Sequence, residues 1–248
     1  MKVIALVGAG GKTSLMYALA REIVAVGSQV ITTTSTKIFP PLPDQSPALL
    51  LVAHDPFLTS LSKTLEIFRH VTVAHRVDPV SGKALGITQD IIDVCAQAAD
   101  WVIVEADGAA GHSVKAPESW EPVIPPCTDL VIPVVGLDCL GKPASNQWVF
   151  RLERFLEITG MKAGEIITAP TLATLVCHEF GGLKDVPPDA SFVPFLNKAD
   201  QVQKEASIEE LVSEFTGRKQ RIKRLVVGQL KPQVQARHFF VSELGRGG

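Results

Sequence analysis

A glycine-rich segment near the start of the chain carries residue types that bind phosphate. The apolar run Val3–Val7 is followed by Gly8, Ala9, Gly10 and Gly11, and then by Lys12, Thr13 and Ser14. Glycines let the main chain approach an anion, and the N–H groups of such a loop and of the next helical turn point at the phosphates. Lys12 is expected to contact the β- and γ-phosphates, and the Thr13 hydroxyl is the expected Mg²⁺ ligand.

The spacing of this loop differs from the usual phosphate-binding pattern G-x-x-x-x-G-K-[ST]. Leu6 stands where the first glycine of that pattern would be, so the loop reads G-x-x-G-K-T and is two residues shorter. An alternative interpretation is a glycine turn followed by an ordinary helix-capping threonine. The apolar run before the loop and the helical pattern after it favour phosphate binding.

A second apolar run delivers two acidic residues. Trp101–Val104 is followed by Glu105, Ala106, Asp107 and Gly108. Ligands of parallel α/β sheets bind at the carboxyl ends of strands, and a carboxylate there can hold Mg²⁺ directly or through water. Alternation along an extended chain places Glu105 and Asp107 on one side and Ala106 on the other. Lys12, Glu105 and Asp107 are therefore the candidate catalytic residues, and the Gly108 N–H can donate to a γ-phosphate. Which acid faces the metal stays open.

A run of hydroxyl residues follows another strand-like segment. Thr32, Thr33, Thr34, Ser35 and Thr36 precede Lys37. One of these hydroxyls, assigned here to Thr34, could complete the Mg²⁺ shell. Threonine is also simply a favourable strand residue, which is the alternative interpretation.

The segment Asn197-Lys198-Ala199-Asp200 follows an apolar run and has the N-K-x-D pattern with which GTPases read guanine. An Asp200 carboxylate can accept from both N1–H and the exocyclic N2–H₂ of guanine, a pairing that adenine cannot reciprocate. Asn197 would brace the site, and the Lys198 stem would lie over the base. A solvated turn at a strand end is the alternative interpretation.

Strand-like and helical segments alternate along the chain and predict an α/β fold with a mostly parallel sheet. The expected architecture is a three-layer sandwich like that of P-loop NTPases, in one domain over 1–248, with an excursion near 38–90 and a frayed tail at 245–248. Strands are expected at Val3–Val7, Val30–Thr33, Leu49–Val52, Val71–Ala74, Trp101–Glu105, Leu130–Val135, Phe192–Asn197 and Arg224–Val227. Helices are expected at Lys12–Val26, Thr88–Ala98, Arg151–Gly160, Pro170–Phe180 and Ser207–Phe215.

Composition fits a cytoplasmic enzyme. The chain has 248 residues, 46% of them hydrophobic, which is enough for a full core. Its net charge of −2 argues against a nucleic-acid or membrane partner held by bulk electrostatics. The four cysteines lack C-x-x-C spacing and are expected to be thiols, and no apolar stretch approaches the roughly 18 residues of a membrane span.

Together these motifs resemble the YqeC family. The residues that carry the resemblance are, in chain order, Gly8–Thr13, Thr32–Lys37, Glu105–Gly108, Lys115–Pro117, Glu121–Pro125 and Asn197–Asp200. The resemblance implies a P-loop NTPase that assists the maturation of selenium-dependent molybdenum hydroxylases, with the client hydroxylase or its maturation proteins as partners and homodimerisation left open. The family tends to carry a histidine before the arginine that matches Arg151, whereas this chain has Phe150.

Two further similarities suggest different reactions. The order of the E-x-x-G and N-K-x-D motifs is similar to that of GTPases that serve as nickel and cobalamin metallochaperones, which implies Mg²⁺-dependent GTP hydrolysis. The short G-x-x-G-K-T loop is also that of Mur ligases, which implies an ATP-dependent synthetase or kinase acting on a small substrate. A third hypothesis is a nucleotide-binding switch without turnover.

Overall fold

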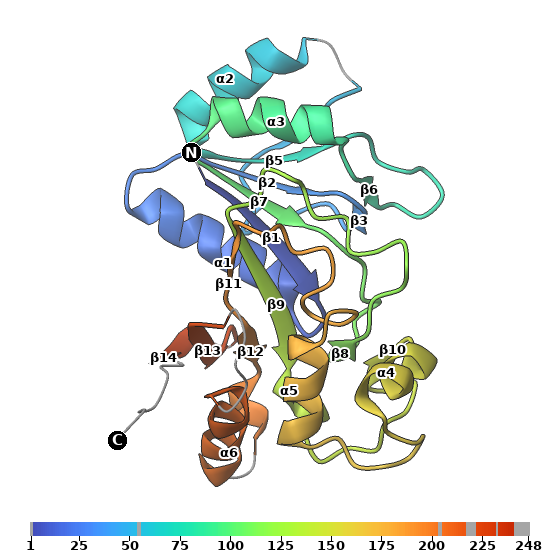
Figure 1. Cartoon of the computed structure of the whole chain (residues 1–248). Helices are drawn as coiled ribbons and strands as arrows, with labels where there is room; N and C mark the ends of the chain where they lie inside the picture. Colours follow the sequence, from blue (N-terminus) through green and yellow to red (C-terminus); the bar gives the residue numbers. More distant parts are fainter. Residues whose placement is uncertain (1, 54–55, 203–204, 217–221, 232, 241–248) are drawn as a thin grey trace. The chain divides into compact units, whose positions relative to one another are not determined.

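The computed structural model describes residues 2–53, 56–202, 205–216, 222–231 and 233–240 (Figure 1). The predicted frayed tail at 245–248 lies outside these ranges. The chain divides into two compact units. Unit 1 comprises Met1–Leu6, Lys12–Gly108 and Val123–Leu130, and unit 2 comprises Val7–Gly11, Ala109–Pro122 and Val131–Gly248. The single-domain organisation over 1–248 stays a prediction.

Unit 1 is built on a parallel sheet. Its strands, in spatial order, are β4 (Leu49–Leu51), β5 (His70–Ala74), β2 (Val30–Thr34), β7 (Trp101–Glu105) and β1 (Lys2–Gly8), whose last two residues belong to unit 2. The register pairs Leu6 of β1 and Thr34 of β2 with Glu105 of β7. Because parallel strands end at the same edge, the residues that follow β1, β2 and β7 lie near one another.

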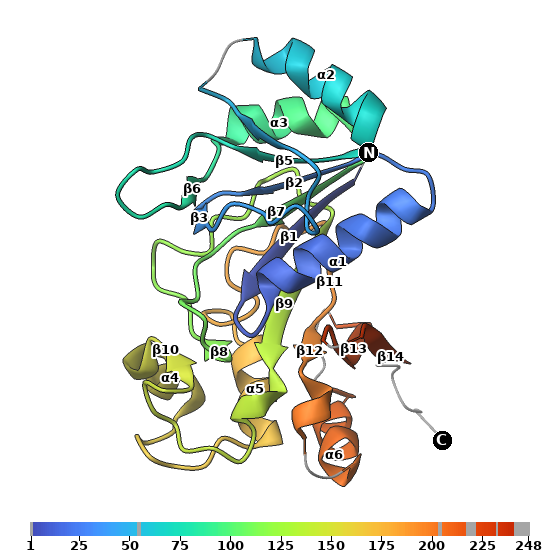
Figure 2. The ribbon, with the colours of Figure 1, turned by 180° about the vertical axis from the view of Figure 1, so that it is seen from behind.

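Helices cover both faces of this sheet, so unit 1 has three layers (Figures 1 and 2). Helix α1 (Lys12–Ala25) packs on β2 and β7, and helices α2 (Phe57–Phe68) and α3 (Gln89–Ala98) pack on the opposite face. The α2 and α3 side contains a continuous apolar core, which includes Val3, Ile31, Leu61, Leu65, Val71, Ile92, Cys95 and Val102. The short strands β3 (Lys37–Ile38) and β6 (Ala84–Leu85) form a separate antiparallel pair.

Unit 2 contains a second set of paired strands and the remaining helices. Strands β9 (Leu130–Gly136), β12 (Phe195–Asn197) and β13 (Arg224–Gln229) are parallel, β14 (Gln235–Phe240) is antiparallel to β13, and β11 (Ser191–Phe192) pairs with β9. Strands β8 (Val114–Lys115) and β10 (Val149–Phe150) form a small pair. The helices are α4 (Leu152–Thr159), α5 (Ala169–Cys177) and α6 (Glu205–Thr216), with 3₁₀ turns at Leu137–Cys139 and Ala199–Gln201.

The predicted fold class is confirmed, since helices alternate with a mostly parallel sheet. The element prediction differs from the structure in several details. Helix α2, strand β14 and the short strands β3, β6, β8 and β10 were not predicted. The expected strand Phe192–Asn197 is two short strands separated by Val193 and Pro194. Proline lacks the N–H that a sheet ladder needs, which accounts for this break. The proline-rich stretch from residue 39 to residue 47 is a loop.

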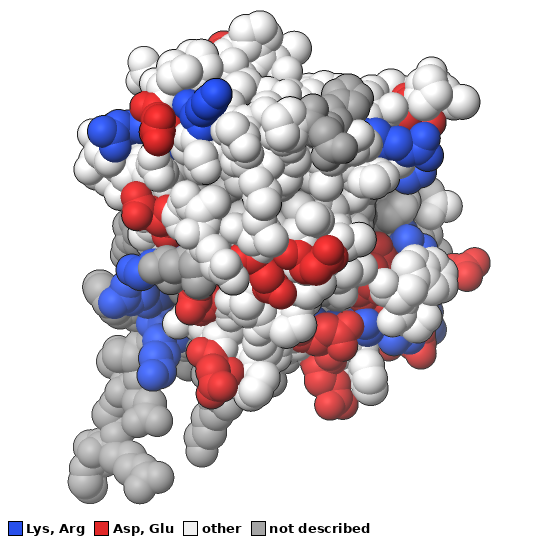
Figure 3. All heavy atoms as spheres, turned by 90° about the horizontal axis from the view of Figure 1, so that it is seen from above, with Lys and Arg blue, Asp and Glu red and all other residues white. Residues whose placement is uncertain are grey.

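The cysteines are thiols, as the sequence predicted. Cys95, Cys127, Cys139 and Cys177 are all free thiols. On the face seen in Figure 3, basic and acidic side chains lie interspersed among a larger uncharged area. Across the described ranges, every helix is too short or too polar to cross a lipid bilayer.

Candidate functional site

The glycines of the loop after β1 are required by its backbone. Gly8, Gly10 and Gly11 have φ angles of +87°, +88° and +124°. A Cβ atom at Gly8 would lie 2.5 Å from the Val134 carbonyl oxygen, and one at Gly10 would lie 2.1 Å from the Gly136 nitrogen. Both the conformation and the lack of space therefore exclude larger side chains here.

Two N–H groups of this loop are already used within unit 2. The Ala9 N–H donates to the Val134 carbonyl at 2.9 Å, and the Gly10 N–H donates to the His112 carbonyl at 2.9 Å. In this structure the Ala9 and Gly10 N–H groups therefore have partners within the protein, and phosphate binding by the loop stays a prediction. The N–H groups that remain candidates for an anion begin at Gly11 and continue into the first turn of α1, where helical N–H groups lack intrahelical partners.

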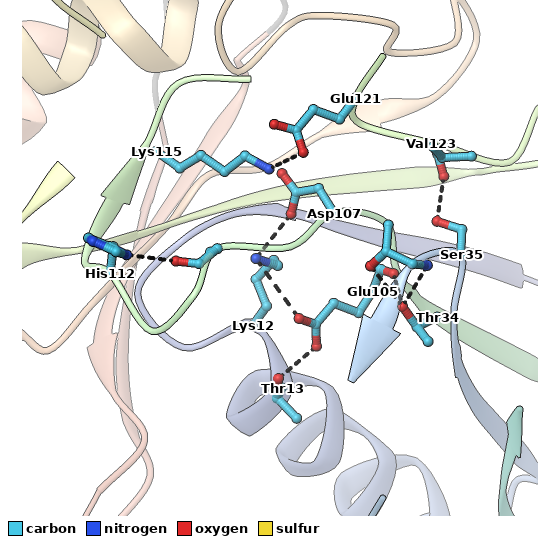
Figure 4. Close-up of polar contacts among 12 residues, drawn as sticks. Lys12, Thr13, Thr34, Ser35, Glu105, Asp107, His112, Lys115, Glu121 and Val123 are labelled. Atoms are coloured by element: carbon cyan, nitrogen blue, oxygen red, sulfur yellow. Dashed lines mark hydrogen bonds and ion pairs between the residues drawn. The ribbon is translucent and has the colours of Figure 1, made fainter. Parts of the chain in front are cut away.

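Helix α1 begins at Lys12 and places this lysine against the acidic turn after β7 (Figure 4). Lys12 Nζ lies 3.0 Å from Asp107 Oδ1 and 3.9 Å from Glu105 Oε1. The Thr13 hydroxyl donates to Glu105 Oε2 at 2.7 Å. Ser14 occupies the same first turn and is half-buried. The lysine, the threonine and both acids are thus brought together in unit 1, as the sequence predicted.

The two acidic side chains meet at Lys12, which contacts both of them. Between them, the Ala106 N–H donates to the Leu6 carbonyl at 2.9 Å, which ties the chain directly after β7 to β1. Lys12, Glu105 and Asp107 are 3%, 6% and 1% exposed. Nothing lies within 4 Å of a Cβ atom built on Gly108, so the main chain is open to approach on that side.

Thr34 lies at the end of β2 and holds the main chain of Glu105. Its hydroxyl donates to the Glu105 carbonyl at 2.8 Å and accepts from the Thr36 N–H at 3.0 Å. The Ser35 N–H also donates to the Glu105 carbonyl, at 3.1 Å. The structure thus gives Thr34 a main-chain role, and its predicted metal-binding role stays a prediction.

The side-chain oxygen atoms near Lys12 would suit Mg²⁺ in a site whose coordination is completed by phosphate and water. Glu105, Asp107 and Thr13 offer hard oxygen atoms, which Mg²⁺ prefers. Within the described ranges, no three His, Cys, Asp or Glu side chains gather where they could hold a metal ion. A magnesium ion here would therefore depend on phosphate oxygens and water for the rest of its octahedral shell.

In unit 2, Asn197 connects the N-K-x-D segment to the glycine loop. Its amide Nδ2 donates to the Gly10 carbonyl at 2.7 Å, and the side chain is buried. A Cβ atom at Gly11 would lie 2.4 Å from the same Nδ2. Asn197 therefore contacts the glycine loop directly, and its bracing of a guanine site stays a prediction. Asp200 is exposed and accepts from Gln201 Nε2 at 2.6 Å.

Lys198 has a partner that sequence reasoning missed. Lys198 has a left-handed backbone, with φ of +62°, and its Nζ lies 2.7 Å from Asp138 Oδ2 and 3.4 Å from Ser113 Oγ. Asp138 follows the carboxyl end of β9 by two residues. An acid directly after a buried strand is the signal that identified Glu105 and Asp107, and the same signal could have identified Asp138.

Polar groups are also buried beneath α1. Burial lowers the pKa of His70 to about 4 and raises the pKa of Tyr17 to about 12. The Thr32 hydroxyl lies 3.0 Å from His70 Nε2 and 2.8 Å from the Thr72 hydroxyl. These groups are held in their neutral forms at physiological pH and stabilise the sheet rather than contributing charge to the loop.

Comparison with known proteins identifies the family. The YqeC protein family matches residues 4–153, which include the glycine loop, Lys12, Thr13 and the acidic turn. A relative from Escherichia coli (strain K12), named "Uncharacterized protein YqeC", is 35% identical over 215 residues, covering 85% of this chain and 81% of the relative. The chain therefore belongs to the YqeC family.

Proposed function

We propose that this protein binds a nucleoside triphosphate together with Mg²⁺, prefers GTP and hydrolyses it. The observation that carries the proposal is the buried cluster at the start of α1. There Lys12 Nζ lies 3.0 Å from Asp107 Oδ1, and the Thr13 hydroxyl donates to Glu105. A lysine, a hydroxyl and two carboxylates directly after a glycine loop are the groups that phosphoryl transfer requires.

Each residue has a distinct role in this proposal. The N–H groups of Gly11 and of the first turn of α1 bind phosphate oxygens, and Lys12 neutralises charge on the β- and γ-phosphates. Thr13 and the two carboxylates hold the metal, with Thr34 as a further candidate ligand. Magnesium, when bound, supplies charge neutralisation between the β- and γ-phosphates. Gly108 donates its N–H to the γ-phosphate.

The proposed preference for guanine rests on Asp200. Its exposed carboxylate can accept from two guanine N–H groups, whereas adenine offers no matching pair. Asn197 supports this segment through its bond to the Gly10 carbonyl. Lys198 is held by Asp138, which fixes the direction of its side chain.

A titration with GTP and with ATP, each with Mg²⁺, tests this proposal. We expect GTP to bind at least about tenfold more tightly than ATP, which corresponds to about 1.4 kcal/mol. Asp200→Ala should remove the preference, and Lys12→Ala should weaken both nucleotides. Asp189→Ala, which changes another exposed aspartate of unit 2, is the matched control and should keep the preference.

Other outcomes would identify the competing reactions. Equal or tighter binding of ATP, with no effect of Asp200→Ala, would favour a synthetase or kinase of the kind suggested by the short G-x-x-G-K-T loop. Tight binding without phosphate release, alone or with cell extract, would favour a nucleotide-dependent switch. Phosphate release above background in the wild-type protein, lost in Lys12→Ala, would support hydrolysis.

For the cellular role, we propose that GTP hydrolysis times the maturation of selenium-dependent molybdenum hydroxylases in the cytoplasm. This role is supported by the motif resemblance to the YqeC family. Its test is hydroxylase activity and hydroxylase selenium content in cells that lack the protein. Wild-type protein should restore both quantities and Lys12→Ala should not. Unchanged hydroxylase activity in the deletion strain would refute the role.

A further inference from the structure

Lys12 lies against the two carboxylates that the proposed function assigns to the metal. Lys12 Nζ lies 3.0 Å from Asp107 Oδ1 and 3.9 Å from Glu105 Oε1, while Glu105 Oε2 accepts from the Thr13 hydroxyl. Figure 4 shows the ammonium group between the two acids. The proposed metal-binding oxygens are therefore engaged by a cation and a hydroxyl of the protein itself.

This arrangement makes the binding of a metal alone unfavourable. Lys12, Glu105 and Asp107 are at most 6% exposed, and separating buried opposite charges is costly. A divalent cation bound by the two carboxylates would lie next to the positively charged Lys12 ammonium group unless Lys12 moved away. Two carboxylates and a hydroxyl also leave about half of an octahedral shell to other ligands.

The binding of a nucleotide alone is also unfavourable, because it would take the Lys12 cation away from the two carboxylates. If Lys12 turned toward the phosphates, Glu105 and Asp107 would remain as two buried carboxylates facing a polyanion. When nucleotide and metal arrive together, the exchange is balanced. The ammonium group moves from the carboxylates to the phosphates, and the metal takes its place between the carboxylates and the phosphates.

We propose that Lys12 is an internal counterion that occupies the metal site of this protein until nucleotide and divalent cation bind as a pair. The inference rests on the proposed function for the identity of the nucleotide, but its central claim concerns Lys12 and the two acids alone. It predicts strong positive coupling between metal and nucleotide. It also predicts that removal of the lysine charge opens the carboxylates to a metal without any nucleotide.

Mn²⁺ binding measured by electron paramagnetic resonance tests this claim without relying on catalysis. Lys12→Met should bind Mn²⁺ at least about tenfold more tightly than the nucleotide-free wild type, because the carboxylates lose their internal cation. Lys12→Arg, the matched control that keeps the charge, should stay as weak as the wild type. Adding Glu105→Gln and Asp107→Asn to Lys12→Met should abolish the gain.

A thermal-unfolding series provides the second measurement and reports whether Lys12→Met is folded. Mg²⁺ should raise the melting temperature of Lys12→Met and leave that of the wild type unchanged. Equal Mn²⁺ affinity in folded Lys12→Met and wild type would overturn the proposal. If Lys12→Met does not fold, the test uses the wild-type protein with a non-hydrolysable GTP analogue that is shown to bind. Equal Mn²⁺ affinity of the wild type with and without this analogue would then overturn the proposal.

The two proposals fail in different ways. A wild-type protein that binds neither GTP nor ATP under any condition would refute the proposed function. The gain of Mn²⁺ binding in Lys12→Met requires no nucleotide, so it would still test the internal counterion.

Discussion

Lowering the pH should destabilise the protein through one buried histidine. His70 lies on β5 and is 4% exposed, and burial lowers its pKa from 6.5 to about 4. Its Nε2 lies 3.0 Å from the Thr32 hydroxyl, and the Tyr17 ring is 6.3 Å away. These two neighbours are uncharged at neutral pH, and burial away from water disfavours an imidazolium at this position.

The sign and size of the effect follow from the two pKa values. The unfolded chain binds a proton at His70 near pH 6.5, whereas the folded chain does so only near pH 4. Stability from this group is therefore complete above about pH 6.5 and is lost as the pH falls toward 4. The loss amounts to about 2 kcal/mol at pH 5 and approaches about 3 kcal/mol at pH 4.

Urea unfolding at pH 7 and pH 5 measures this loss. The quantity to compare is the change in unfolding free energy between the two pH values, since His70→Gln will also alter packing at both. His70→Gln should reduce the change by about 2 kcal/mol. His75→Gln, which replaces an exposed histidine next to the same strand, should behave like the wild type. If His70→Gln loses as much stability as the wild type, the assignment to His70 is refuted.

Two further substitutions test the loop and the strand end. Gly10→Ala should abolish nucleotide binding and should destabilise the protein, because the added Cβ would lie 2.1 Å from the Gly136 nitrogen. Gly27→Ala is the control, since Gly27 has a similar φ of +85° but open space around it, and it should destabilise the protein less. Gly27→Ala should cost only about 1 kcal/mol, measured by urea unfolding, and equal costs for the two would contradict the steric argument. Thr34→Val should lower stability by about 1 to 2 kcal/mol and weaken Mg²⁺-nucleotide binding, because it removes the hydroxyl bond to the Glu105 carbonyl. Thr34→Ser keeps the hydroxyl and should retain nucleotide affinity. Weaker nucleotide binding by Thr34→Ser would argue that the loss in Thr34→Val does not come from the bond to the Glu105 carbonyl.

The sequence predicted the central cluster because its geometry follows from parallel strands. The runs that became β1 and β7 are rich in branched apolar residues and end at the same edge, with Leu6 paired with Glu105. The residues that follow each strand, Lys12 and Asp107 among them, must then approach one another. Strand periodicity alone was enough to place both acids on one side of the turn.

Other features depend on contacts between distant segments and could not be predicted in this way. Helix α2 buries only Leu61 and Leu65, while its apolar residues Leu58 and Ile67 are exposed, so its buried face becomes clear only from the packing against the sheet. The pairing of Lys198 with Asp138 joins residues 60 positions apart. The direction of the Ala9 and Gly10 N–H groups depends on where the chain returns through His112 and Val134.

The direction of those two N–H groups links the short loop to the behaviour proposed for Lys12. Because Ala9 and Gly10 donate to the protein, fewer main-chain donors remain to neutralise a triphosphate than in a loop whose amides all face the anion. In the proposed function, Lys12 and the metal would then carry more of the neutralisation. Lys12 contacts the same two carboxylates that would hold the metal. Under that proposal the short loop and the shared acid pair act in the same direction, since both would make the affinity for nucleotide depend strongly on the divalent cation.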